Sequence, residues 1–452
     1  MGPPLNSSAK AKALAGEICR TLSERGHQAY LVGGCVRDLL LKRLPADYDV
    51  GTDATPDQVE ELFPNSVLVG ARFGVVIVVR DGLQVEVATF RSDVGYSDGR
   101  HPDNVIFAKT PQEDVARRDF TINGMMMNPA TGEVLDFVGG SADLRAGIVR
   151  TIGNAAERFR EDKLRLVRAI RFASRFGYGI ELHTLLAIRQ LAPQVTTVSA
   201  ERLRDELTKL LTEGAARRAF ELLDETGLLE PLLPEVARLK GVEQPPQFHP
   251  EGDVWIHTLL MLEKLSVLPP EARTMTLAWG VLLHDIGKPA TFRSAAQTGD
   301  RIRFDGHAEV GVRVAEEVCR RFRFSNEETE QVVSLVANHM RFKDVPQMRA
   351  STLKRFVRLP KFEEHLELHR IDCLSSHGHL DNWEYVREFI AKTPAEEVHP
   401  ARLVTGDDLL EMGFLPGPEF KTILQAVEDA QLEGLFRTRE EALAYVRKEY
   451  AR

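Results

Sequence analysis

The stretch LVGGCVRDLLLKRLPADYDV, residues 31–50, combines the patterns of a strand, a glycine turn, a helix and a second strand. Asp47 and Asp49 alternate along that second strand, with Tyr48 between them. Residues two apart on a strand project to the same side, so we expect both carboxylates on one face and the tyrosine on the other. Similar β-branched and aromatic runs precede and follow, each closed by Gly, Asp or Pro. The first part of the chain is therefore predicted to contain a mixed sheet.

Two carboxylates on one strand face suit a divalent metal. Hard Mg²⁺ prefers carboxylate and phosphate oxygens, and a two-metal site can activate a hydroxyl nucleophile and stabilise departing pyrophosphate. Gly34 opens the preceding helix, where backbone N–H groups can meet phosphate, and Arg37 adds a cation. An exposed strand end would explain an isolated DxD pattern equally well. The glycine turn and the arginine upstream favour a metal and nucleotide site instead.

Composition indicates a globular chain of several domains. Its 452 residues are 43% hydrophobic and 28% charged, which at about 100 to 200 residues per domain suggests roughly two to four domains. No run approaches the roughly 18 apolar residues of a membrane span, and the start, MGPPLNSSAK, lacks the apolar core of a signal peptide. The four cysteines have neither metal-site nor disulfide spacing, which fits a reducing compartment. We therefore expect a cytoplasmic protein with no membrane partner.

The net charge of -9 argues against a general polyanion binder, although a basic cluster lies between residues 145 and 175. Strand patterns fade after Asn154, and apolar residues then recur at spacings of three and four, which is typical of helices. The clearest such segments are 155–176, 201–212, 308–322 and 326–341. The predicted fold class is therefore α+β, with a β-containing head before an all-α remainder.

EDKLRLVRAIRF, residues 161–172, lies in the basic cluster and is predicted to belong to one regular helix over 155–176. Its apolar row consists of Leu164, Val167, Ile170 and Ala173. An adjacent row consists of Arg165, Arg168 and Arg171. A solvated helix face, with an ion pair between Asp162 and Arg165, explains this pattern when it is taken alone. Other parts of the chain must decide whether the row has a function.

GGCVRD followed by DYD resembles the polymerase-beta nucleotidyltransferase superfamily, specifically its class II tRNA nucleotidyltransferase and bacterial poly(A) polymerase branch. Further motifs of that branch are similar in the same order: ARRDFTINGMMMNP (116–129), EDKLRLVRAIRF (161–172) and ERLRDEL (201–207). Gly124 and His101 stand where such enzymes more often carry Ala and Arg. The resemblance implies a nucleotidyltransferase head with a mixed sheet, followed by an all-α neck, body and tail.

The resemblance assigns recognition of the nucleobase to Asp162 and Arg165. Cytosine and adenine each present an amino donor beside an unprotonated ring nitrogen, whereas uracil and guanine present a carbonyl beside an N–H. The Asp162 carboxylate can accept from the amino group while the Arg165 guanidinium donates to the ring nitrogen. This pair would select C and A, so the protein itself would act as the template.

The resemblance also makes Asp47 and Asp49 the catalytic residues and the ligands of Mg²⁺. It implies a nucleotide-binding set of Gly34, Arg37, Arg118, Asp119, Asp162, Arg165, Arg168 and Arg171. The guanidiniums of this set can contact phosphates. Arg117 with its two neighbours could instead form only a charge cluster near a strand. Glu201 and Arg202 are expected to brace the neck.

A second set of metal-ligating residue types occurs farther along the chain. It consists of His257, His284, Asp285 and Asp372, and it resembles the H…HD…D metal set of HD phosphohydrolases. Imidazole and carboxylate ligands suit a transition metal, and His307 and His339 are candidate extra ligands. A single helical histidine is more often a satisfied buried side chain, but the HDIGK sequence flanked by the others favours metal binding. HD modules joined to this family can hydrolyse phosphoesters or be structural.

The resemblance implies four domains. These are a catalytic head (1–150), a helical neck and body with nucleotide recognition (151–245), an HD domain (246–392) and a helical tail that contacts tRNA (393–452). In the tail, LVTGDDLLEMGFLPGPEF has Gly and Pro turns leading into a helix, where backbone N–H groups could meet phosphate.

The expected activity is Mg²⁺-dependent addition of CCA to the 3′ end of tRNA from CTP and ATP. A poly(A) polymerase, or an enzyme adding only part of this sequence, is an alternative within the same family. VLVGARFGVVIVV (67–79) is more similar to the CCA-adding form, and residues 91–114 resemble a flexible loop that enzymes adding only CC lack. An HD metal-dependent phosphohydrolase and a non-catalytic RNA-binding module are alternatives of other classes. The sequence leaves the oligomeric state undetermined.

Overall fold

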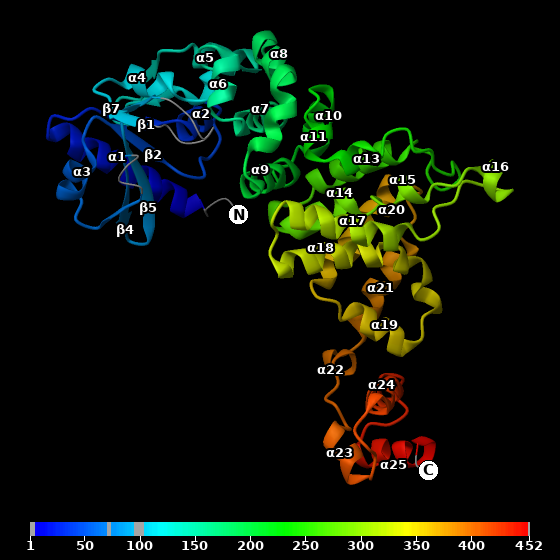
Figure 1. Cartoon of the computed structure of the whole chain (residues 1–452). Helices are drawn as coiled ribbons and strands as arrows, with labels where there is room; N and C mark the ends of the chain where they lie inside the picture. Colours follow the sequence, from blue (N-terminus) through cyan, green and yellow to red (C-terminus); the bar gives the residue numbers. More distant parts are fainter. Residues whose placement is uncertain (1–4, 70–73, 95–103, 451–452) are drawn as a thin grey trace. The chain divides into compact units, whose positions relative to one another are not determined.

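The computed structural model describes residues 5–69, 74–94 and 104–450 (Figure 1). The structure does not describe residues 70–73 and 95–103, and His101 falls in the second of these gaps. Parts of the stretches 67–79 and 91–114, which bear on the choice between family members, therefore lie outside the described residues. The chain divides into two compact units. The first consists of Met1–Arg238, Leu265–Met275 and Arg321–Arg323, and the second of Leu239–Lys264, Thr276–Arg320 and Phe324–Arg452.

A mixed sheet of seven strands forms the head of the first unit, as predicted. Its strand order is β3-β4-β5-β2-β1-β8-β9. The strands are β1 (Ala29–Val32), β2 (Asp49–Thr52), β3 (Ser66–Leu68), β4 (Val75–Arg80), β5 (Leu83–Thr89), β8 (Met125–Met127) and β9 (Val134–Asp136). Only the β2–β5 pair in this sheet is parallel. A separate antiparallel pair joins β6 (Arg91–Val94) to β7 (Asn104–Phe107).

Short helices cover and connect the strands of the head. α1 (Leu5–Glu24) packs against β1, β2 and β5 and buries Ile18 and Leu22 completely. The others are α2 (Gly34–Leu40), α3 (Pro56–Leu62), α4 (Pro111–Ala116) and α5 (Gly140–Ala146). α2 begins after Gly33, whose φ of 73° lies in the left-handed region that glycine adopts without strain. The predicted sequence of strand, glycine turn, helix and strand over 31–50 is confirmed.

Helices dominate the rest of the first unit, with one small exception. Two-residue strands β10 (Ile148–Val149) and β11 (Gly179–Ile180) pair in parallel. The helices are α6 (Ala155–Glu161), α7 (Leu164–Phe176), α8 (Leu182–Leu191), α9 (Ala200–Thr212), α10 (Ala216–Glu225), α11 (Leu229–Leu232) and α12 (Pro234–Ala237). α7 packs against α9 and α10.

The single helix predicted over 155–176 is wrong in one respect, because the chain breaks between α6 and α7. Asp162 has extended backbone angles, φ -147° and ψ 105°. Its carboxylate Oδ1 accepts a hydrogen bond from the backbone N–H of Leu164 at 3.1 Å. An aspartate that binds a backbone N–H two residues ahead favours a helix start over a helix interior. The predicted apolar row of α7 is nevertheless buried.

Within the described residues, the second unit consists of helices joined by loops, with one isolated antiparallel bridge between Arg293 and Arg303. Its larger helices are α13 (Val254–Ser266), α14 (Met275–Leu283), α17 (His307–Arg321), α18 (Asn326–Asn338), α19 (Ala350–Val357), α20 (Phe362–Ser375) and α21 (Asp381–Lys392), with the short α15 (Lys288–Thr291) and α16 (Ala295–Thr298) between them. Residues 276–283 of α14 are all buried, so this helix lies in the core. A Cβ atom on Gly287 would lie 2.1 Å from the carbonyl oxygen of His307, so only glycine lets these two segments approach.

The last part of the second unit has its own small core. It contains α22 (Ala395–Val398), α23 (Gly406–Glu411), α24 (Pro418–Leu432) and α25 (Arg439–Tyr450). Leu409, Ile423, Val427 and Val446 are buried at its centre. In the part of the chain that the structure describes, no helix is both long enough and apolar enough to cross a membrane.

Candidate functional site

The DxD pair lies at the start of β2. Asp49 is its first residue and is half-buried, while Asp47, just before it, is exposed. Tyr48, between them, is only 3% exposed. The side chains therefore alternate across the sheet, and the two carboxylates share one face.

A third carboxylate stands beside this pair. Glu86 of β5 lies opposite Asp49 in the parallel register of the two strands. Burial, together with repulsion from Asp47 and Glu86, raises the pKa of Asp49 to about 7, although Arg118 acts against the shift. A divalent cation would offset both the lost solvation and the like charge, so this face fits a metal ion. Glu86 is not among the predicted site residues, although the alternation of LQVEVATF places it on one face of a strand.

Arg117 and Arg118 are both held by Asp114, a residue the sequence analysis did not single out. Oδ1 of Asp114 accepts from Arg117 Nη2 at 2.6 Å, and Oδ2 accepts from Arg118 Nη2 at 2.8 Å. Although burial opposes ionisation, the two arginines lower the pKa of Asp114. A Cβ atom on Gly33 would lie 3.0 Å from Nη1 of Arg118. The glycine turn and this guanidinium thus form one cationic, donor-rich corner.

Asp119 and Arg168 form an ion pair across 49 residues of sequence. Nε and Nη2 of Arg168 donate to Oδ2 of Asp119 at 3.0 and 2.5 Å. Oδ1 of Asp119 accepts from the backbone N–H of Phe120 at 2.8 Å and from Asn123 Nδ2 at 3.2 Å. Against the effect of burial, Arg168 holds the pKa of Asp119 at about 2. Their predicted nucleotide-binding role stays a prediction.

The predicted base-reading pair lies where α6 ends and α7 begins. Asp162 Oδ2 accepts from Nη2 of Arg202 at 2.7 Å, and Arg165 Nη1 donates to Oε2 of Glu161 at 2.7 Å. Arg165 is therefore paired with Glu161, and the alternative of an ion pair to Asp162 is wrong. The Arg165 side chain is only 12% exposed, so this arginine does not lie on a solvated face. Arg202, expected to brace the neck, holds Asp162 itself.

Two arginines of the predicted nucleotide set are buried. Arg37 is 5% exposed and donates to Asp38 and to Asn123 Oδ1, the latter at 2.7 Å. Arg171 is 7% exposed, and its Nε donates to Oε1 of Glu206 at 2.5 Å. Glu206 is the second glutamate of ERLRDEL, so this motif supplies a buried counter-charge to α7. The contacts of both arginines with nucleotide stay predictions.

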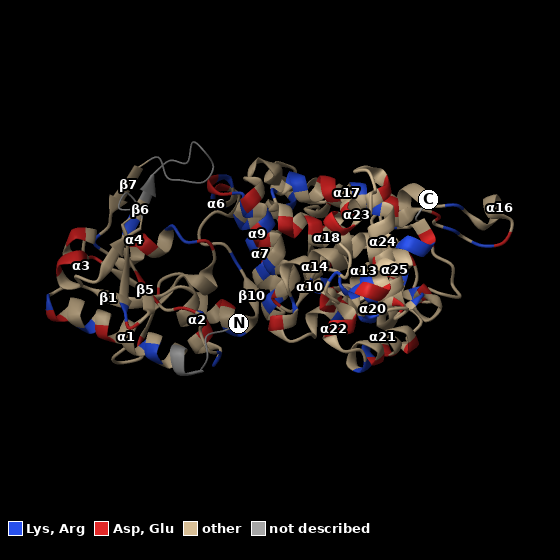
Figure 2. Cartoon of the chain, turned by 90° about the horizontal axis from the view of Figure 1, so that it is seen from below, with Lys and Arg blue, Asp and Glu red and all other residues tan. Residues whose placement is uncertain are grey.

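Acids are interspersed with the basic residues of the neck. Figure 2 shows Lys and Arg along α7 and α9 among Asp and Glu, in keeping with the ion pairs of Arg171 with Glu206 and Glu213. These ion pairs neutralise part of the positive charge of α7.

The second unit brings the predicted HD residues together. Nε2 of His257 lies 3.3 Å from Oδ1 of Asp372, and Nε2 of His284 lies 3.1 Å from Oδ2 of Asp285. The donor atoms of His257, His284 and Asp372 all lie within 4.8 Å of one another. The four residues therefore form one cluster on α13, α20 and the segment after α14.

A second triad shares the same cluster. The donor atoms of Asp285, His307 and His339 also lie within 4.8 Å of one another, and the two histidine Nε2 atoms are 3.1 Å apart. Both predicted extra ligands are thus brought to the centre. Burial lowers the pKa of His339 to about 4, which leaves this imidazole neutral near pH 7. Asp285 belongs to the HD pair and lies in the second triad as well, so the two groups of candidate ligands adjoin at this residue.

The backbone sets the orientation of three of these rings. Nδ1 of His284, His307 and His339 lies 2.7 to 2.9 Å from the carbonyl oxygen three residues earlier. Each Nδ1 must carry the proton to donate to a carbonyl, so each neutral ring presents the Nε2 lone pair to the cluster. Nε2 of His284 and of His257 is buried without a hydrogen-bond partner among the described residues. Each of these nitrogens faces an aspartate oxygen without an aligned hydrogen bond, an arrangement that fits a shared transition metal.

A cavity of about 670 Å³ opens beside this cluster. Its lining includes the ligand residues Asp285, His307, His339 and Asp372 together with Phe248, Phe304, Lys288, Arg301 and Lys343. A ligand in the cavity would thus meet metal-ligating groups, cations and aromatic rings.

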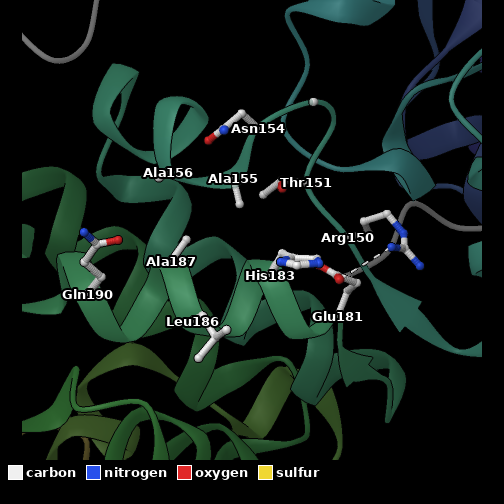
Figure 3. A pocket seen from close by; sticks show the side chains of 11 residues that line it. Arg150, Thr151, Asn154, Ala155, Ala156, Glu181, His183, Leu186, Ala187 and Gln190 are labelled. Carbon is white, nitrogen blue, oxygen red and sulfur yellow. Dashed lines mark ion pairs between the residues drawn. The ribbon is translucent and has the colours of Figure 1, made fainter.

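A different pocket, of about 420 Å³, lies in the neck (Figure 3). Its walls come from the start of α6 and from α8, and Arg150 Nη1 is 3.7 Å from Oε1 of Glu181 there. None of the predicted site residues lines it. It therefore has no evident share in the two sites above.

Comparison with protein families finds three matched segments. Residues 29–150 match the poly A polymerase head domain, residues 177–240 the probable RNA and SrmB-binding site of polymerase A, and residues 254–375 the HD domain. The DxD pair falls in the first segment, Arg202 in the second, and the histidine cluster in the third.

Comparison with individual proteins finds CCA-adding enzymes. That of Bacillus licheniformis is 39% identical over 290 residues, 63% of this chain and 70% of the relative. That of Geobacillus thermodenitrificans is 44% identical over 211 residues, 47% of this chain and 52% of the relative, so the match spans about half of that relative's length. The crystal structure of the Bacillus stearothermophilus CCA-adding enzyme in complex with CTP has 29% identity and a TM-score of 0.73, covering 99% of this chain and 98% of that one.

The buried Arg171–Glu206 pair generates a stability prediction. Changing Arg171 to Ala should lower the free energy of unfolding by about 3 to 5 kcal/mol, because it leaves the Glu206 carboxylate, 3% exposed, without its counter-charge. The double variant Arg171→Met/Glu206→Leu should recover most of this loss, since it removes both charges. Urea unfolding measures both, with the exposed Arg160→Ala as a control expected within about 0.5 kcal/mol of the wild type. Equal stability of Arg171→Ala and Arg160→Ala would contradict the prediction.

Proposed function

Because the chain belongs to the CCA-adding enzyme family, we propose that it adds CCA to the 3′ end of tRNA, with CTP and ATP as substrates. The observation that carries this proposal is the likeness of nearly the whole chain to a CCA-adding enzyme crystallised with CTP. The DxD face, the glycine turn with Arg118 and the Asp162–Arg165 pair give the three parts such a reaction needs: a metal site, a phosphate site and a base-reading site.

In the proposed reaction the 3′-hydroxyl oxygen of tRNA forms a bond to the α-phosphorus of the nucleotide, and the bond from that phosphorus to the bridging oxygen breaks. Asp47 and Asp49 would hold Mg²⁺, with Glu86 beside them. Mg²⁺ bound there supplies activation of the hydroxyl and neutralisation of the departing pyrophosphate. Arg118, held by Asp114 at the glycine turn, donates to the triphosphate.

The base would be read at the break between α6 and α7. Arg165 has five N–H donors, of which three contact Glu161 and the carbonyl oxygens of Arg158 and Arg117, which leaves two for a ring nitrogen. Asp162 Oδ2 accepts from Arg202 and retains a second lone pair for an amino group. The existing contacts therefore orient Asp162 and Arg165 and still leave each of them able to form a hydrogen bond with the base.

Other parts of the proposal concern partners and location. The helical tail, residues 393–452, would contact tRNA. Residues 1–150 would form the catalytic head, residues 151–245 would recognise the nucleotide, and residues 246–392 would form the HD domain. A cytoplasmic location suits an enzyme of tRNA processing and fits the four buried free cysteines.

The direct test supplies a tRNA that lacks CCA with CTP and ATP. We expect addition to stop after CCA, whereas a long A tail would indicate a poly(A) polymerase and a missing C or A step a partial enzyme. Asp49→Asn should lower transfer by more than about 100-fold, because several kcal/mol of metal-mediated charge stabilisation is lost. Its melting temperature should not fall, since the change relieves repulsion. The exposed turn variant Asp81→Asn is the matched control, and equal transfer by both variants would contradict the assignment.

The base-reading pair predicts a change in nucleotide choice. Asp162→Ala and Arg165→Ala should each lose about 1 to 3 kcal/mol of preference for CTP and ATP over UTP and GTP, because one of two hydrogen-bonded contacts is removed. Single-nucleotide incorporation with all four NTPs at saturating Mg²⁺ measures it. Arg160→Ala, on the exposed side of α6, should keep wild-type discrimination. If Asp162→Ala also keeps it, the template hypothesis is wrong.

We also propose, as a second function, that the HD unit binds divalent transition metal and hydrolyses phosphoesters. The observation favouring it is the convergence of imidazole Nε2 atoms and two aspartates beside a cavity lined by cations. Bound metal would supply Lewis-acid activation of water, while Lys288 and Arg301 would attract the phosphate.

Removing one ligand separates the two functions. His284→Ala should lower the content of bound Mn²⁺ or Ni²⁺ and abolish phosphodiesterase activity, since the ring supplies one Nε2 to the cluster. CCA addition should remain at the wild-type level, because the DxD face lies in the other unit. Metal analysis and both assays check this, with the exposed His399→Ala as a control. Wild-type metal content in His284→Ala would contradict the proposed centre.

A further inference from the structure

His257 differs from the other histidines of the HD cluster in what holds its ring. The side chain is completely buried, and its Nε2 faces Asp372. Its Nδ1 lies 2.7 Å from Oε1 of Glu251, a residue that precedes α13 and belongs to neither predicted site. A carboxylate therefore occupies the position behind this ring.

The local backbone explains why a carboxylate is needed. In His284, His307 and His339 the carbonyl oxygen three residues earlier holds Nδ1. For His257 the equivalent carbonyl is that of Val254, and it accepts instead from the hydroxyl of Thr258 at 2.8 Å. Among the described residues, Glu251 is the hydrogen-bond partner that holds Nδ1 of this ring. Loss of Glu251 would remove the contact that sets the ring orientation.

Glu251 is itself fixed in place. Its side chain is only 7% exposed, and the same Oε1 lies 2.9 Å from Nδ1 of His249. His249 lines the cavity beside the metal-ligating residues. Glu251 sits in the HPEG turn, which ends at Gly252 with a φ of 129° that L side chains rarely adopt. The turn thus directs one carboxylate inward, onto two imidazoles at once.

We propose that Glu251 is a positioning residue of the HD centre, which fixes the His257 ring so that Nε2 points at a divalent transition metal shared with His284 and Asp372. This role rests on the proposed metal binding of the HD unit. A carboxylate behind a ligand histidine both sets the ring orientation and increases its basicity, and loss of such a partner typically lowers metal affinity about 10- to 100-fold.

The test is a calorimetric titration of the metal-free full chain with Ni²⁺. Glu251→Ala should bind about 10- to 100-fold more weakly than the wild type, and Glu251→Gln, whose amide oxygen still accepts, should lose less. Glu309→Gln changes an exposed carboxylate that lines the same cavity and should bind like the wild type. Melting temperatures of all variants show that each is folded.

A second measurement reports on the ring without metal. In the apo chain labelled with ¹⁵N-histidine, the Nδ1 proton of His257 should be protected from exchange with water, and it should be identified by its loss in His257→Asn. Glu251→Ala should lose the protected proton, and Glu309→Gln should keep it. If Glu251 only stabilised the fold, Glu251→Ala would keep the protected Nδ1 proton of His257. Glu251→Gln and Glu251→Ala would then bind Ni²⁺ with the same affinity.

The outcomes separate the role of Glu251 from the metal centre itself. Wild-type Ni²⁺ affinity in Glu251→Ala, or survival of the protected proton, overturns the positioning role alone. A wild-type chain that binds no Ni²⁺ overturns the proposed centre and this role with it. Weaker binding in Glu251→Ala with partial rescue in Glu251→Gln supports the proposal.

Discussion

The ion pair between Asp119 and Arg168 ties the neck to the head, and the other features of the first unit are arranged around it. Asp119 also accepts from Asn123, whose carbonyl oxygen accepts from Arg37. The helix after the glycine turn, the RRDFTIN segment and α7 are thus joined through a single carboxylate. Ionisation of Asp119 persists well into acid because Arg168 keeps its pKa at about 2. The head and α7 are consequently held in one unit by charge as well as by packing.

The two candidate metal sites differ in how their side chains are held. Among the described residues, the sets of three metal-ligating side chains with donor atoms within 4.8 Å all lie in the second unit. There, rings are pre-oriented by carbonyl groups or by Glu251. At the DxD face, in contrast, carboxylates repel one another and raise the pKa of Asp49. Such a face suits an ion that arrives with a nucleotide, whereas the histidine cluster suits a resident ion.

The sequence predicted most of what depends on short spacing. The mixed sheet, the alternation around Tyr48 and the gathering of the HD residues follow from motifs and periodicity. Contacts across long stretches could not be predicted, because no local pattern encodes them: Asp162 meets Arg202 over 40 residues of sequence. The same limit applies to Glu86, which only strand register brings beside Asp49. The break at Asp162 was missed because apolar periodicity continues through it while a local side-chain hydrogen bond interrupts the helix.

Gly287 illustrates how tightly the HD cluster is assembled. Its position between the HD pair and the start of α17 leaves no room for a methyl group, since any Cβ would overlap the carbonyl oxygen of His307. The segment that follows the HD pair and the start of α17 are therefore in direct backbone contact. A codon change at this one position, to any other amino acid, would push His307 away from Asp285 without touching a ligand. The proposed metal centre would thus be lost through geometry alone, with every one of its candidate ligand side chains still present.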